Sequence, residues 1–146
     1  MTKTICFFVL SIVLCFACKK SNNIEVGPES SGLKVKIKAI SGWGEFANIT
    51  IDQDKTEIKY VNTADNLPQV PKDKAYKTSE ATMKQLLNYI ETYKLMDTKI
   101  DECARCADGM DYIISIQYES RKNTVTIAAQ RSDGKYSDLL DLINKL

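Results

Sequence analysis

Hydrophobic and polar residues alternate strictly from position 33 onward. Leu33, Val35, Ile37 and Ala39 are separated by lysines at positions 34, 36 and 38. Because successive side chains of a strand point to opposite faces, this pattern predicts a β-strand with one buried and one solvated face. Residues 41–45 (SGWGE) interrupt the alternation, and their two glycines permit a tight turn or a bulge.

Further strands are predicted after this turn and again near the end of the chain. They are expected at 46–52, 56–61, 112–118 and 123–130. The last two would form a hairpin across 119–122, with core positions at Ile114, Ile116, Val125 and Ile127. Residues 62–77 contain two prolines and no periodicity, which predicts a long loop.

Two segments have the spacing of amphipathic helices. Ser79 favours a helix start, and an apolar stripe extends that helix to about residue 94 through Met83, Leu86, Leu87, Ile90 and Tyr93. Ser137 is expected to cap a closing helix that carries Leu139, Leu142, Ile143 and Leu146. The order β-β-β-α-β-β-α predicts one α+β domain over 33–146. Its antiparallel sheet of about five strands would carry both helices on one face.

The first 17 residues have the pattern of an export signal. Lys3 precedes a nearly unbroken apolar run over 5–16 (ICFFVLSIVLCF), and Lys19, Lys20 and further polar residues follow. The run fits a signal peptide, since a spanning helix needs roughly 20 apolar residues. The next segment, 18–32, is rich in Ser, Asn, Gly and Pro, which predicts a flexible tether.

Residues 14–18 (LCFAC) resemble the lipobox of bacterial lipoproteins. Ala17 and Cys18 match that pattern, whereas Cys15 and Phe16 depart from it. Cys15 follows Leu14 rather than a small residue, so Cys18 is the expected acceptor. The resemblance implies lipid on Cys18 and a membrane-anchored protein of the cell envelope. Because no acidic signal directly follows Cys18, we expect it on the periplasmic side of the outer membrane.

Composition narrows the chemistry available to the domain. The chain has no histidine, which excludes Ser-His-Asp and Cys-His catalysis and any zinc site containing histidine. It has 20 basic and 19 acidic residues, and loss of Lys3 with the signal leaves 19 of each. This balance does not favour nucleic acid as a partner. Lys34, Lys36 and Lys38 alternate with apolar residues, which favours a solvated strand face over a phosphate site.

Cys103 and Cys106 are separated by two residues in the loop before the predicted hairpin. Three interpretations compete. A structural disulfide suits an oxidising compartment and is favoured. A thioredoxin-like redox pair would stand at a helix N-terminus after a strand, whereas this pair follows a helix and precedes a strand. A metal site would need further ligands, so no metal or cofactor is predicted.

Four carboxylates lie in the same loop, at Asp101, Glu102, Asp108 and Asp111. Oxygen ligands at this density could hold calcium, but their spacing fits no full calcium-loop motif. A solvated acidic loop is the favoured interpretation.

Trp43 is the only tryptophan of the chain and stands between two glycines. Packing back over the edge of the core is favoured over contact with a partner. The stretch 41–47 (SGWGEFA), followed by a helix and by 107–112 (ADGMDY), resembles the emfourin family of small bacterial metalloprotease inhibitors.

In the emfourin family a glycine-rich segment meets the protease. That resemblance points to Gly42, Gly44 and Phe46 here, although Trp43 and Glu45 depart from the family's compact pattern. We therefore expect a non-enzymatic, lipid-anchored binding module whose Trp43 turn contacts an unknown envelope protein, with protease inhibition as one version. The alternative is an envelope thiol-disulfide oxidoreductase that uses Cys103 and Cys106.

Overall fold

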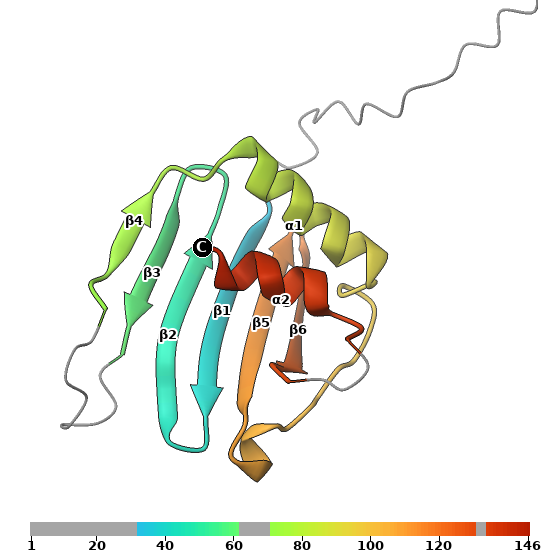
Figure 1. The fold of residues 1–146 in the computed structure, drawn as a ribbon. Helices are drawn as coiled ribbons and strands as arrows, with labels where there is room; N and C mark the ends of the chain where they lie inside the picture. Colours follow the sequence, from blue (N-terminus) through green and yellow to red (C-terminus); the bar gives the residue numbers. More distant parts are fainter. Residues whose placement is uncertain (1–31, 62–70, 131–133) are drawn as a thin grey trace, which may run out of the picture.

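The computed structural model describes residues 32–61, 71–130 and 134–146, and Figure 1 shows their arrangement. The predicted signal 1–17, Cys18 and all of the predicted tether except Gly32 lie outside the described residues. The elements in chain order are β1 (Lys34–Ser41), β2 (Gly44–Ile51), β3 (Thr56–Tyr60), β4 (Lys74–Tyr76), α1 (Glu80–Thr92), the 3-10 turn η2 (Arg105–Ala107), β5 (Met110–Tyr118), β6 (Arg121–Ala128) and α2 (Ser137–Asn144).

One antiparallel sheet has the strand order β4-β3-β2-β1-β5-β6. The first strand lies in the middle, where Ile37 pairs with Ile49 of β2 on one side and Ile114 of β5 on the other. The α+β class and the antiparallel sheet with two helices are confirmed, with six strands rather than five. The additional strand, β4, lies in the predicted loop 62–77, where all three of its residues are exposed and show no alternation.

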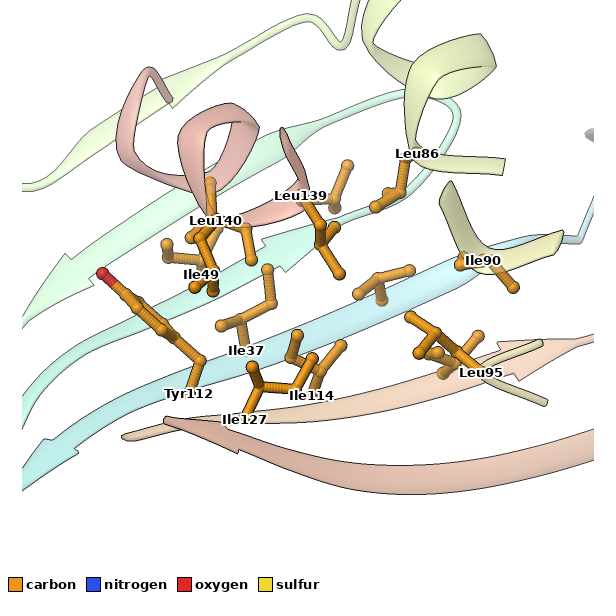
Figure 2. Packing of buried hydrophobic residues seen from close by; sticks show 14 of the residues in the cluster. Ile37, Ile49, Leu86, Ile90, Leu95, Tyr112, Ile114, Ile127, Leu139 and Leu140 are labelled. Atoms are coloured by element: carbon orange, nitrogen blue, oxygen red, sulfur yellow. The ribbon is translucent and has the colours of Figure 1, made fainter. Parts of the chain in front are cut away.

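Both helices cover the same face of the sheet (Figure 1). From α1, Leu86 and Ile90 point down onto the strands, and Leu139 and Leu140 of α2 do the same farther along (Figure 2). All four predicted hairpin core positions are buried, as are the odd-numbered residues 33–39 of the first strand. Burial of apolar area on this single face is the main stabilising term of the fold.

The start of α1 is as expected, and that of α2 is not. Ser79 is the N-cap of α1, and its hydroxyl oxygen accepts a hydrogen bond from the Thr82 N–H at 3.0 Å. Ser137 was predicted as the cap of α2, but it is the first helical residue, and the preceding Tyr136 forms no side-chain cap. Within the described residues, no helix is both long and apolar enough to cross a membrane.

The outer edge of β6 is covered by the segment that leads away from α1. The Thr126 N–H donates to the Ile100 carbonyl at 2.8 Å, and the Glu102 N–H donates to the Thr126 carbonyl at 3.1 Å. This pairing protects the edge strand from association with another chain. It also brings residues 103–109 to the start of β5.

Candidate functional site: the tip of the sheet

The turn between β1 and β2 presents Trp43 to solvent. The Ser41 hydroxyl accepts a hydrogen bond from the Trp43 N–H at 3.0 Å, and Gly44 has a φ of 126°, a conformation that favours glycine. The Trp43 side chain is 80% exposed. The prediction that Trp43 packs over the core edge is therefore wrong: Ser41 pairs with Gly44 across the turn, and the ring stays outside.

A β-bulge places Phe46 beside this turn. Ala39 pairs with Ala47 and Ile40 pairs with Glu45, so Phe46 has no partner on β1. One extra residue in a strand breaks the alternation of faces locally. Phe46 is 38% exposed, and its carbonyl accepts a hydrogen bond from the Val61 N–H of the neighbouring segment.

The Cys103–Cys106 loop lies against the Trp43 turn. Ser41 pairs with Met110, so the segment that enters β5 reaches the same end of the sheet. A Cβ atom added at Gly42 would lie 3.3 Å from the Arg105 carbonyl oxygen. We call residues 41–46 and 103–109 together the tip; Figure 1 shows it at the lower end of the sheet.

The loop is closed by a disulfide and by hydrogen bonds to one carbonyl. Cys103 and Cys106 are disulfide-bonded. The Ala104 carbonyl accepts from the Ala107 N–H at 2.9 Å and from the Gly109 N–H at 2.8 Å. A Cβ at Gly109 would come within 2.7 Å of the Ala104 side chain, so this position requires glycine. The pair follows α1 and precedes β5, as the sequence predicted.

The side chain of Asp111, on β5, anchors the Cys103–Cys106 loop. Its carboxylate is fully buried and accepts hydrogen bonds from the N–H groups of Ala104 at 2.7 Å and Arg105 at 3.4 Å. The Arg105 guanidinium lies 3.6 Å from the same carboxylate. Nothing in the sequence pattern distinguished Asp111 from the solvated acidic residues of the loop, so this role was not predicted.

The four carboxylates of the loop do not share one site. The Asp111 carboxylate accepts the Ala104 and Arg105 N–H groups. The Glu102 carboxylate accepts the Ala128 N–H at 2.8 Å. Asp101 and Asp108 are exposed, and Asp108 adopts a left-handed conformation after η2. Across the described ranges, no group of three or more His, Cys, Asp or Glu residues is placed to hold a metal ion. The calcium interpretation thus receives no support from the geometry.

The partner-binding and disulfide residues predicted from the sequence lie together at the tip. Gly42, Trp43, Gly44 and Phe46 come from one hairpin, and Cys103 and Cys106 come from the adjoining loop. Cys18, the predicted lipid acceptor, lies outside the described residues. No protein-family model matches the chain, and no curated protein matches it either. The resemblance to emfourins stays a prediction.

Proposed function

We propose that this protein is a non-enzymatic, lipid-anchored binding module of the cell envelope, and that its tip docks into another protein. The observation that carries the proposal is Trp43, an aromatic residue 80% exposed on a turn whose flanking residues, Ser41 and Gly44, pair with each other. Tryptophan is enriched among the residues that dominate binding energy in interfaces. A rigid aromatic also loses little conformational entropy on binding.

The surroundings of Trp43 support a preorganised contact surface. Phe46 adds a second exposed aromatic ring from the bulge, and the disulfide loop contacts the turn at Gly42. Lys38 and Glu45 form an ion pair at 3.4 Å on the neighbouring open face. An apolar centre with a polar rim is the usual composition of a transient interface.

The direction of β1 supports the anchored arrangement. The described chain enters β1 beside Leu33, and the tip lies at the other end of that eight-residue strand. At about 3.3 Å per residue, the tip stands roughly 25 Å from the entry. Lipid on Cys18 would attach the chain to the membrane on the side of this entry, and the predicted flexible tether would leave the tip free to reach a partner.

Inhibition of a metalloprotease is the specific version that we would test first. The mature chain would be titrated against a panel of zinc metalloproteases, and the inhibition constant would be measured for the wild type and for Trp43→Ala. We expect at least a tenfold weaker inhibition by the variant. Tyr76→Ala, which removes another exposed aromatic from the far edge of the sheet, is the matched control and should inhibit as the wild type does.

A broader test covers partners outside that panel. A photo-crosslinking residue at position 43 should capture an envelope protein that the same residue at exposed position 76 does not. Equal capture at both positions would refute a docking role for the tip. Intact mass tests the anchor, because an unmodified Cys18 in the mature protein would exclude lipidation.

The alternative is an envelope thiol-disulfide oxidoreductase. The observation that favours it is that both Cys103 and Cys106 are exposed and already bonded to each other. Against it, η2 is a single 3-10 turn, so the thiols lack the α-helix N-terminus that stabilises a reactive thiolate. A disulfide reduction potential far below that of the periplasm, or unchanged function in a Cys103→Ser, Cys106→Ser variant, would exclude the alternative.

A further inference from the structure

The lysines on the open face of the sheet fall into two groups. Lys38 is paired with Glu45, and Lys55 and Lys59 lie 3.1 and 4.0 Å from Glu57. Lys34, Lys36 and Lys122 form no ion pair with any residue in the described ranges. Two carboxylates, Glu45 and Glu57, offset most of the charge of the first group. The second group has no such partner and concentrates positive charge over β1, β5 and β6.

The unpaired lysines surround one depression. It has a volume of about 160 Å³, and all three lysines line it. Lys34 pairs with Gln117, which in turn pairs with Lys122 on β6. Two strand spacings of about 4.8 Å place the two lysine Cα atoms roughly 10 Å apart. Their side chains can therefore reach one ligand over Gln117, with Lys36 approaching from the adjacent row.

The floor of the depression offers further hydrogen-bond donors. The hydroxyls of Ser115 and Thr124 lie 3.1 Å apart, so one donates to the other and one proton remains for a ligand. The amide group of Gln117 adds donors between Lys34 and Lys122. None of the described residues that line the depression is a carboxylate. The nearest on the Lys36 row is Glu57, two strands away and shared between Lys55 and Lys59.

We propose that this depression, which we call the lysine pocket, binds a phosphate-type oxyanion. Three ammonium groups and neutral donors, with no carboxylate, match the charge and the acceptor oxygens of a phosphoryl group. The lysine pocket lies toward the entry end of β1, away from the tip, so the proposal does not depend on the partner-binding function. Because the pocket is open to solvent, we expect binding in the millimolar range that weakens with added salt.

The test is an NMR titration of the chain from residue 18 onward with Cys18→Ser, which keeps it in solution. This chain contains every described contact of the sheet and both helices. Inorganic phosphate and a short-chain phosphatidylglycerol, below its micelle concentration, are added at constant ionic strength. We expect saturable shifts of the backbone amides of residues 34, 36, 115, 117 and 122–124, with no saturable shift at the tip.

Matched variants separate the pocket from general attraction to positive charge. The variant Lys34→Gln, Lys36→Gln, Lys122→Gln should bind at least tenfold more weakly. The variant Lys38→Gln, Lys55→Gln, Lys59→Gln removes the same charge from the same face and should stay within twofold of the wild type. Equal weakening in both variants, or no saturation in the wild type, would overturn the proposal. Lys122→Glu alone is a second probe should the first variant fold poorly.

The two ligands identify the source of the oxyanion. Binding of phosphate alone would identify a free phosphate group as the occupant. Binding of phosphatidylglycerol at a comparable strength would identify a lipid headgroup, in keeping with the position of the pocket near the entry end. Short-chain diacylglycerol, which has the acyl chains but no phosphoryl group, is the control for the acyl chains and should not bind.

Discussion

The core and the tip of this protein are held together by different interactions. In the core, two helices and one sheet face bury apolar side chains, and many residues share the stabilisation. At the tip, a disulfide, glycine contacts and a buried carboxylate hold a short stretch of backbone, and the large side chains stay outside. The tip can therefore change its exposed residues without loss of the fold, whereas the core cannot.

Tyr112 and Asp111 mark the boundary between the two regions, on successive residues of β5. Tyr112 lies on the helix-covered face and donates its hydroxyl hydrogen bond to Asn144 of α2 at 2.7 Å. Asp111 is equally buried but holds the loop of the tip. Substitutions on either side of this boundary should change the free energy of unfolding by different amounts, which allows the comparison to be tested.

The largest effect is expected for Ile114→Ala in the core. Ile114 is 1% exposed beneath the helices (Figure 2), and its truncation should lower the free energy of unfolding by about 2–5 kcal/mol. The measurement is chemical denaturation. Ile113→Ala is the matched control, since Ile113 points to the open face and is only half-buried. Equal losses for the two variants would mean that the open face is not solvent-exposed.

Asp111→Ala is expected to cost about 2–4 kcal/mol, because the Ala104 and Arg105 N–H groups lose their acceptor. The exposed Asp101 provides the control, and Asp101→Ala should leave denaturation unchanged. Hydrogen exchange should show faster exchange at the amides of 104–109 in the Asp111 variant. An unaltered exchange pattern there would mean that Asp111 does not anchor the tip.

Removal of the disulfide should have a smaller effect. The bridge closes a loop of only four residues, and the chain-entropy estimate for that length is about 2 kcal/mol. The variant Cys103→Ser, Cys106→Ser should therefore unfold at a urea concentration about 1 M lower, with the same dependence on denaturant. A loss greater than about 4 kcal/mol, twice the chain-entropy estimate, would mean that the disulfide stabilises more than its own loop.

The sequence predicted the core far better than the tip. Alternation gave the buried face of β1, and helical spacing gave Leu86 and Ile90, because these signals repeat within one element. No such signal exists for β4. Its three residues are exposed, and it pairs with β3 although it lies within the segment predicted as a loop.

At the tip and in the lysine pocket, each arrangement depends on contacts between distant segments. Asp111 accepts from backbone groups, which any residue supplies, so its role could not be distinguished from that of Asp108. Lys122 of β6 lies near Lys34 of β1 only because β5 pairs with both strands. The exposure of Trp43 required knowledge of the turn geometry.

Tyr112→Phe tests the boundary at alkaline pH. Burial raises the pKa of Tyr112 above its ordinary value of about 10, so folding favours the protonated phenol. That contribution is complete below the unfolded pKa and is lost as the pH rises through the raised folded pKa. At neutral pH the variant should lose about 1 kcal/mol with its hydrogen bond. Above pH ~10 its stability should fall less steeply. Burial also raises the pKa values of Tyr76 and Tyr93, so part of the slope should remain.

The smallest effect on stability is expected for Trp43→Ala. With 80% of its surface exposed, the side chain should contribute no more than about 0.5 kcal/mol to folding. Denaturation of the wild type and the variant under the same conditions measures this difference. A loss greater than about 1 kcal/mol would place Trp43 among the residues that hold the tip together. A near-zero loss of stability, combined with weaker partner binding, would show that the Trp43 side chain contributes to binding and not to folding.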